Sequence, residues 1–152
     1  MSAPPIFVPV LHEPWTVEVR SRSRTTVALD VRRPVDGGVT VELERCAAGR
    51  LRHTYPVHSH DVEARVTGTL PGPLLADLLV ALFAAVEAAD PYSRRLVFAA
   101  SADDCSTIAA AESAGFRYVV DFDLPDAQLS LLVAEPSWVT AVDMDLDHVP
   151  GT

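Results

Sequence analysis

The sequence has no lysine and very little cysteine. All twelve basic residues are arginine, and Cys46 and Cys105 are the only thiols. These two cysteines lie too far apart in the chain to form a metal knuckle or a paired redox motif. We therefore expect no disulfide framework and a reduced protein of the cytoplasm.

Long apolar stretches and a targeting signal are also lacking. The longest apolar run, Leu78–Val86, has nine residues between Asp77 and Glu87. This is about half the length that a bilayer-spanning helix needs. The first residues do not combine a basic start, an apolar core and a small-residue cleavage site. The run therefore predicts a buried helix, and we expect no membrane partner.

Positive charge is scarce, because 12 Arg stand against 21 Asp and Glu for a formal net charge of -9. Such a charge repels phosphate backbones and anionic lipid heads. The arginines between Arg20 and Arg33 form only a short basic stretch, so we expect no nucleic-acid partner. The 152 residues are 49% hydrophobic, which suits one globular domain that folds without a metal or a disulfide.

The N-terminal half has the patterns of an arm and a set of strands. Prolines at four of the first fifteen positions predict an extended arm over residues 1–15. Apolar residues then alternate with polar ones, which predicts half-buried strands around three sets: Val17 and Val19; Val27, Leu29 and Val31; Val39, Val41 and Leu43. Between the second and third sets, Asp36-Gly37-Gly38 supplies the positive φ that a hairpin turn needs.

Residues 58–67 continue this alternation and carry titratable side chains. The pattern predicts one apolar face, made by His58, His60, Val62, Ala64 and Val66. The opposite face would be in contact with water and would carry Asp61, Glu63, Arg65 and Thr67.

The second half changes to a helical period. A broad apolar stripe from Leu74 to Val86 predicts a helix that starts near Pro71 or Pro73 and ends at Asp90-Pro91. Residues 95–100 predict a buried strand. Residues 107–114 predict a second helix, with Ser101 or Asp103 as N-cap and Gly115 as its left-handed end. Residues 116–122 and 129–134 predict a closing hairpin, and residues 137–152 an acidic tail.

The segment Arg94–Val133, with the helix end Glu112-Ser113-Ala114-Gly115-Phe116, resembles the C-terminal half of the GNAT superfamily of acyl-CoA N-acyltransferases. The resemblance implies an α+β fold with a GNAT-like mixed central sheet. The strand-rich N-terminal half would be followed by β-α-β-α-β-β, in a single domain over residues 16–136. The strand at 95–100 would then lie parallel to the strand before Gly68. The two early helices of the family have no counterpart in the first 70 residues.

The same resemblance implies an acetyl-CoA site. Its cofactor-binding residues would be Gly68, Leu70, Gly72, Leu74 and Asp104, the last in place of an Asn of the family. The pyrophosphate loop, Thr67–Gly72, contains no basic residue. Pro71 and Pro73 remove two of the N–H groups that bind phosphate at a helix start. We therefore expect acetyl-CoA to bind weakly.

The choice of candidate catalytic residues is limited by Ala111, which stands where the family often has a catalytic Tyr. A helical Tyr that often serves the family as general acid would align with Ala111, which has no proton to give. The remaining candidates for proton handling are Glu63, Asp61 and His60. Strand alternation places the two carboxylates on one face and His60 on the other, so we rank Glu63 first and His60 second.

Two functions remain open at this point. The first is an acyl-CoA-dependent N-acyltransferase that acts on a small-molecule or protein amine. The second is a noncatalytic relative with a degenerate coenzyme A site that binds a small molecule or a protein, as a monomer or a homodimer. His58 and His60 have a spacing that metal sites on sheets use, but partly buried strand histidines are commoner, and we expect no metal.

Overall fold

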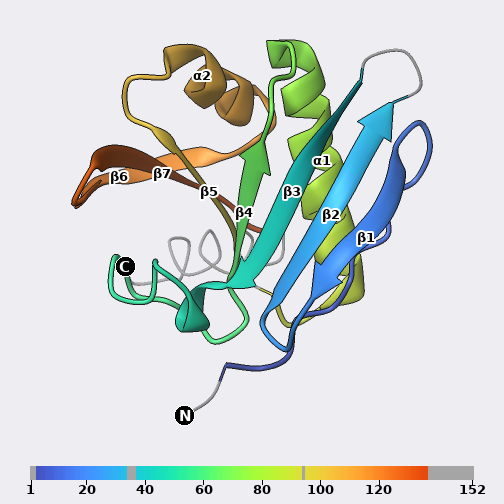
Figure 1. Ribbon diagram of the computed structural model, residues 1–152. Helices are drawn as coiled ribbons and strands as arrows, with labels where there is room; N and C mark the ends of the chain where they lie inside the picture. Colours follow the sequence, from blue (N-terminus) through green and yellow to red (C-terminus); the bar gives the residue numbers. More distant parts are fainter. Residues whose placement is uncertain (1–2, 34–36, 94, 137–152) are drawn as a thin grey trace, which may run out of the picture.

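The computed structural model describes residues 3–33, 37–93 and 95–136. They form one mixed sheet of seven strands, in the order β1-β2-β3-β4-β5-β7-β6, together with two α-helices (Figure 1). In chain order the elements are β1 Thr16–Arg22, β2 Thr26–Arg33, β3 Gly37–Arg45, a 3-10 turn Cys46–Ala48, β4 Val62–Thr67, α1 Gly72–Ala89, β5 Leu96–Ser101, α2 Cys105–Ser113, β6 Arg117–Leu124 and β7 Ala127–Ala134. The predicted α+β class and the predicted order of elements are confirmed.

The first four strands are antiparallel neighbours. β2 pairs with β3 along its whole length, from Thr26 opposite Glu44 to Arg33 opposite Gly37. Gly37 has a φ of +82°, as the predicted hairpin turn requires. The apolar members of β2 and β3 face one side of the sheet and are buried, as their alternation predicts: Val27, Leu29, Val31, Val39, Val41 and Leu43. On β1, Val17 is half-buried and Val19 is 50% exposed, so this edge strand is less covered than predicted.

The centre of the sheet contains its one parallel pair among the described residues. β4 and β5 are parallel and are joined by α1, as the resemblance implied. β7 then inserts antiparallel beside β5, and β6 pairs with β7 at the edge of the sheet. This order leaves β4 and β5 as central strands, each with neighbours on both sides.

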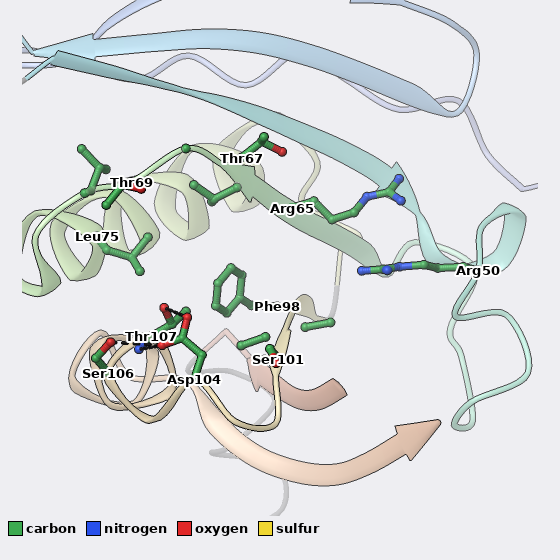
Figure 2. A pocket seen from close by; sticks show the side chains of 15 residues that line it. Arg50, Arg65, Thr67, Thr69, Leu75, Phe98, Ser101, Asp104, Ser106 and Thr107 are labelled. Carbon is green, nitrogen blue, oxygen red and sulfur yellow. Dashed lines mark hydrogen bonds between the residues drawn. The ribbon is translucent and has the colours of Figure 1, made fainter. Parts of the chain in front are cut away.

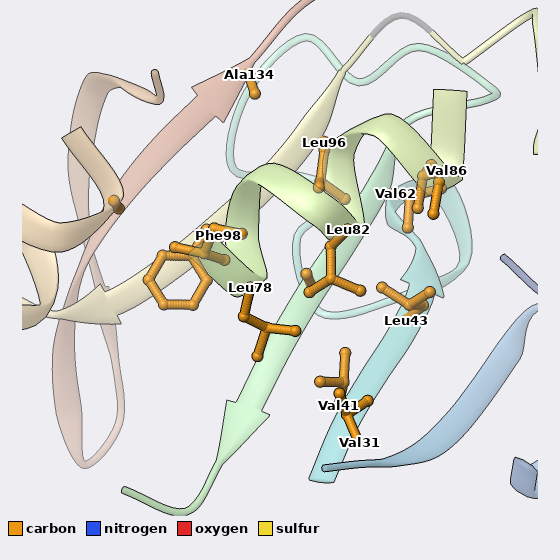
Figure 3. Packing of buried hydrophobic residues seen from close by; sticks show 14 of the residues in the cluster. Val31, Val41, Leu43, Val62, Leu78, Leu82, Val86, Leu96, Phe98 and Ala134 are labelled. Atoms are coloured by element: carbon orange, nitrogen blue, oxygen red, sulfur yellow. The ribbon is translucent and has the colours of Figure 1, made fainter. Parts of the chain in front are cut away.

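Both helices cover the same face of the sheet and form the main core with it. Figure 3 shows Leu78 and Leu82 of α1 packed over the strands. Ala110 and Ala111 of α2 join the same cluster. Residues 3–15 contain no helix or strand, yet three of their side chains are buried in this core, namely Ile6, Leu11 and Trp15.

Helix α1 is long and apolar enough, by length and composition alone, to cross a membrane. In the fold, six of its side chains are buried: Leu75, Leu78, Leu79, Leu82, Ala85 and Val86. Core helices have the same composition, because they bury an apolar stripe against a sheet.

A second, smaller cluster lies on the other face of β5 and β7. The connection between β3 and β4, residues 46–61, covers this part of the sheet. Its side chains Cys46 and Leu51 pack with Val97, Leu131 and Val133. The predicted acidic tail, residues 137–152, lies outside the described residues.

Helix α2 corrects the predicted N-cap. The cap is Asp104, and neither Ser101 nor Asp103 fills that role, because the Asp104 carboxylate accepts the Thr107 N–H at 3.1 Å. The helix therefore starts at Cys105, two residues earlier than predicted. Its end is as predicted, since Gly115 has a φ of +97° and the next N–H, of Phe116, bonds back to the Ala111 carbonyl at 3.0 Å.

Strand β4 corrects a second prediction. It starts at Val62, and residues 58–60 belong to the preceding turn. Glu63 is 1% exposed and Asp61 is fully buried, so the face predicted to be in contact with water is closed at this end. The physical reason is tertiary: the connection 46–61 folds over β4 and β5, and sequence alternation alone does not indicate such a cover.

We expect the stability of the fold to decrease measurably at alkaline pH because of Cys46. Burial raises the pKa of its thiol from the ordinary 9.0 to about 12, and the hydrogen bond with Tyr55 offsets only part of this effect. The folded pKa exceeds the unfolded one, so stability from the protonated thiol is complete below pH 9 and is lost as the pH rises toward 12. The loss from Cys46 is up to roughly 4 kcal/mol.

Urea unfolding between pH 8 and pH 11 checks this expectation. The Cys46→Ala variant should lose less stability over that range than the wild type, whatever its stability at pH 8. Burial also raises the pKa of Tyr55, so part of the decline should remain in the variant. Cys105→Ala is the matched control, because Cys105 is exposed. Equal slopes for wild type and Cys46→Ala would contradict the assignment.

Candidate functional site

The two parallel strands separate at their carboxyl ends. Their pairing stops at Ala64 opposite Phe98, although β4 continues to Thr67 and β5 to Ser101. A cavity of about 490 Å³ opens where they diverge. The carboxyl ends of parallel strands are the usual place for a ligand in such a sheet. The lining comprises Arg50, Arg65, Val66, Thr67, Gly68, Thr69, Leu70, Leu75, Phe98, Ala99, Ala100, Ser101, Asp104, Ser106 and Thr107.

The two ends of the cavity differ in chemistry. Figure 2 shows Thr69 and Leu75 at one end, the guanidinium groups of Arg50 and Arg65 at the other, and Phe98 between them. Leu75 comes from α1, and Arg50 comes from the connection 46–61. The cavity therefore runs from the two helix starts to a pair of arginines.

Three of the five predicted cofactor-binding residues line this cavity, namely Gly68, Leu70 and Asp104. Gly72 and Leu74 lie in the first turn of α1 and are not among the lining residues. Gly68 has a φ of +120°, and a Cβ there would lie 3.0 Å from Val39 Cγ1. Both the backbone conformation and the space therefore favour glycine at this turn.

The start of α1 has few N–H groups to offer an anion. Pro71 is the N-cap and Pro73 lies in the first turn, so neither has an N–H. The Leu75 N–H already bonds the Pro71 carbonyl at 2.9 Å. Gly72 and Leu74 are the remaining donors of that turn. The arginines of the lining lie at the other end of the cavity (Figure 2), so the N–H groups of Gly72 and Leu74 have no arginine of the lining beside them.

Asp104 is occupied as a helix cap. Its two oxygens accept hydrogen bonds from the Thr107 N–H, from Thr107 Oγ1 at 2.7 Å and from Ser106 Oγ at 3.0 Å. The hydrogen bonds from Thr107, followed by the one from Ser106, lower the pKa of this exposed carboxyl. Asp104 is thus a carboxylate at neutral pH, and most of its acceptor capacity is already in use.

Glu63, the first-ranked catalytic candidate, lies behind the cavity wall. Its carboxylate accepts from Arg50, with Nη2 at 2.6 Å and Nε at 3.1 Å from Oε2. Glu63 does not line the cavity, whereas Arg50 does. Its catalytic role stays a prediction, and its direct contact is with Arg50.

Asp61 and His60 lie at the opposite end of β4 from the cavity. The fully buried Asp61 carboxylate accepts from Tyr55 Oη at 2.9 Å and from the His58 N–H at 3.0 Å. Burial raises the pKa of Asp61 despite these hydrogen bonds. His60 Nδ1 lies 3.1 Å from an oxygen of Asp90. The structure therefore does not bring the three candidates together at one site.

Sequence reasoning missed Arg50 as a site residue. Arg50 follows a turn glycine in an irregular connection, and no spacing in that segment indicates that it reaches β4. Arg65 was visible as a polar residue of β4, but nothing assigned it to a cavity. Ala111, at the position of the family's Tyr, is fully buried, so it leaves α2 without a side-chain acid there.

The described residues contain no group of three or more His, Cys, Asp or Glu side chains that could hold a metal ion. His58 and His60, which have the spacing of metal ligands on a strand, have ring centroids 6.2 Å apart. They lie in the turn before β4, so strand geometry does not align them.

No protein-family model matches the sequence, and no curated protein matches it. Solved structures do match the fold. An uncharacterized protein from Bacillus halodurans has a TM-score of 0.67 at 19% identity, over 74% of this chain and 60% of that one. Aminoglycoside acetyltransferase AAC(6')-Ib in complex with coenzyme A has a TM-score of 0.64 at 14% identity, over 77% and 70%. The GNAT domain of S. lividans PAT has a TM-score of 0.54 at 18% identity, over 74% and 61%.

These similarities define the class of fold. The mixed sheet, its parallel β4–β5 pair and the two helices form a GNAT-like fold, as the resemblance at the helix end Glu112–Phe116 implied. The chain spans 60% of the length of the Bacillus halodurans protein. The protein has a GNAT-like fold, and at these identities the likeness shows the fold alone.

Proposed function

We propose that the protein binds the acyl-pantetheine end of an acyl-coenzyme A between β4 and β5 and transfers the acyl group to an amine. The observation that carries this proposal is the divergence of the two strands beyond Ala64 and Phe98 into a cavity of about 490 Å³. Support comes from AAC(6')-Ib, which has a similar fold and was solved with coenzyme A and with acetyl-CoA.

The cavity walls offer backbone groups suited to an amide-containing chain. Beyond their last pair, β4 and β5 have N–H and C=O groups that no longer bond to each other. An extended ligand inserted between them would satisfy these groups, as a strand added to a sheet edge does. A backbone N–H directed at the thioester oxygen would stabilise the charge that develops there during transfer. The amine nitrogen would then bond to the carbonyl carbon, the C–S bond would break, and the amine proton would end on the thiolate.

Among the described residues, the lining offers no free general base. Asp104 is the one carboxylate of this described lining, and Ser106 and Thr107 already bond to it. No His, Cys, Tyr or Glu of residues 3–33, 37–93 or 95–136 lines the cavity. The amine must therefore lose its extra proton to water before it attacks, and the proton released on attack passes through water to the thiolate.

This gives an expected pH profile. With an alkyl amine whose pKa is about 10, kcat/KM should rise about tenfold for each pH unit between pH 7 and 9, because the neutral fraction of the amine rises by that factor. Initial rates of thiol release from acetyl-CoA, with a panel of primary amines, measure this slope. A plateau below pH 8 would show that a group of the protein takes the proton, and would contradict the proposed route.

A second candidate function is noncatalytic binding in the same cavity. The observations that favour it are the buried Ala111 at the position of the family's acid and the two prolines at the start of α1. The two functions differ in a simple measurement, since only the first releases coenzyme A from acetyl-CoA in the presence of an amine.

Under either function, we expect acetyl-CoA to bind with a Kd no tighter than about 100 μM, which corresponds to roughly 5.5 kcal/mol. The reason is that Pro71 and Pro73 have no N–H to donate, and that the described lining has no basic residue at the helix end of the cavity. Isothermal titration calorimetry measures this constant directly. Low-micromolar binding would contradict our account of the pyrophosphate site.

Two variants locate the binding. Ser101→Trp should abolish it by filling the cavity from the exposed end of β5, whereas Ser21→Trp, on the distant strand β1, should leave it unchanged.

The double variant Leu70→Arg, Pro71→Gly adds a charge and a donor at the start of α1, and should tighten binding about tenfold or more. An unchanged Kd in the double variant would place the phosphates elsewhere.

A further inference from the structure

Five charged side chains from three segments gather at one end of the cavity. They form a mixed ion cluster of Glu42 and Glu44 on β3, Arg50 in the connection 46–61, and Glu63 and Arg65 on β4. The strand register places Glu44 opposite Glu63, and Glu42 opposite Arg65.

The cluster holds both arginines in fixed positions. Glu63, 1% exposed, takes two donors of Arg50. Glu44 Oε1 accepts from Arg65 Nη2 at 2.9 Å, and Glu42 Oε2 lies 3.8 Å from the same nitrogen. A buried carboxylate that fixes a guanidinium pre-organises its remaining donors for a ligand.

Gly49 makes room for one of these carboxylates. A Cβ at Gly49 would lie 2.5 Å from Glu44 Oε1, closer than real Cβ atoms come to a neighbour. The φ of Gly49 is -111°, which other residues adopt easily. A larger residue at this position would therefore have to displace the Glu44 carboxylate, and the glycine lets Glu44 reach Arg65.

Only the two arginines of the cluster line the cavity. The three glutamates are not among the lining residues, and Glu63 is buried behind Arg50, whereas the Glu42 side chain is 50% exposed. Arg65 Nε is too buried to meet a ligand, but Arg65 Nη1 donates in none of the hydrogen bonds found in the described part of the chain. The hydrogen bonds from Arg50 to Glu63 use its Nε and Nη2 groups, and its Nη1 donates in none of those found in the described part of the chain. Planar donors of this kind match a carboxylate.

The net charge of the cluster further restricts the class of ligand that can bind there. Two guanidinium groups and three carboxylates leave a formal charge of -1. A simple anion would find free N–H donors on the arginines, but the net charge of the cluster around it would be negative and would repel it. A molecule with both a carboxylate and an ammonium group satisfies the donors of the arginines and also complements the surplus negative charge.

We infer that the acceptor of the proposed acyl transfer is a zwitterionic amine, such as an amino acid, whose carboxylate binds Arg50 and Arg65. This inference rests on the proposed function for the fate of the amine, but the binding of the carboxylate stands on the cluster itself. Arg50 and Arg65 are then specificity-determining residues, and Glu63 and Glu44 are positioning residues behind them.

Binding of small probes tests the inference without catalysis. The probes are glycine, β-alanine and 4-aminobutyrate as zwitterions, with propylamine as the amine alone and propionate as the carboxylate alone. We expect ligand-observed NMR titrations to show at least one zwitterion binding tenfold or more tightly than both single-charge probes. Equal affinity for propylamine and the zwitterions, or no binding of any zwitterion, would overturn the inference.

Variants separate direct contact from general charge effects. Arg65→Gln should weaken binding of the zwitterion tenfold or more, because a charge-assisted hydrogen bond is lost. Arg24→Gln, on the exposed turn between β1 and β2, removes the same charge and should leave binding unchanged. Gly49→Ala should weaken binding as well, with no change of charge. Arg50→Gln would leave the buried Glu63 carboxylate without its cation. The double variant Arg50→Gln, Glu63→Gln therefore tests that arginine in a folded protein.

The outcomes distinguish this inference from the proposed function. Binding of zwitterions without release of thiol from acetyl-CoA would refute the transferase and leave the carboxylate site standing. Acyl transfer to propylamine as fast as to β-alanine would support the transferase and refute the carboxylate site. Loss of binding in Arg24→Gln equal to that in Arg65→Gln would also refute the site.

Discussion

Replacing Arg45 by methionine is expected to destabilise the fold by about 3–5 kcal/mol, the usual cost of breaking a buried ion pair from one side. Arg45 is fully buried. Its Nη2 lies 2.7 Å from Asp90 Oδ2 and 2.8 Å from the Pro5 carbonyl, and its Nη1 lies 2.7 Å from the His60 carbonyl. Methionine fills a similar volume but leaves the Asp90 carboxylate buried without its cation.

Urea unfolding at neutral pH measures this loss. Arg22→Met, at an exposed position of β1, should change stability by less than about 0.5 kcal/mol. The double variant Arg45→Met, Asp90→Leu removes both charges and should recover most of the loss, since apolar replacements of a buried pair are often neutral. A double variant as unstable as Arg45→Met would show that the carbonyl contacts, and not the unpaired carboxylate, carry the effect.

The dependence of stability on acidic pH provides an independent test of the pair formed by Arg45 and Asp90. Burial alone would raise the pKa of Asp90, but the hydrogen bonds from His60 and Arg45 outweigh it and lower the pKa below the ordinary 3.8. A lowered folded pKa means that the stabilisation is present above the unfolded pKa and is lost as the pH falls through the folded one. The wild type should therefore lose stability below about pH 4, and Arg45→Met should lose less.

The same pair shows where sequence reasoning succeeds. Asp90-Pro91 was predicted to end the helix that starts near Pro71, and α1 does end at Ala89. Proline and glycine restrict or free the local backbone, so their positions in the sequence also predicted the hairpin at Gly37 and the helix end at Gly115. The tie from Asp90 to Arg45, 45 positions away in the chain, has no local signal.

The candidate site shows the opposite limit. Gly68 and Asp104 were predicted from a family pattern and do line the cavity. Glu63 was predicted to face water, because alternation gives the side of a strand but not what covers that side. The covering connection, residues 46–61, is irregular, and its Arg50 has no periodicity that could show its contact with β4.

Glu63→Gln is the second substitution with a large expected effect. We expect kcat/KM for transfer to a zwitterionic amine to fall by ten- to hundredfold, because the neutral amide holds the Arg50 guanidinium less firmly than the carboxylate does. Rates of thiol release from acetyl-CoA measure the change. Glu18→Gln, at an exposed position of β1, is the matched control and should keep the wild-type rate.

The pH profile of Glu63→Gln decides between positioning and base catalysis. A positioning residue leaves the tenfold rise per pH unit intact and shifts the whole curve downward, with the loss largest for acceptors that carry a carboxylate. A general base, the role that its place on the strand suggested, gives a wild-type curve that levels off near its own pKa and a variant that loses this plateau. The burial of Glu63 behind Arg50 favours the first result, since a base must reach the proton that it removes. A levelled wild-type curve that becomes linear in Glu63→Gln would restore Glu63 as the base.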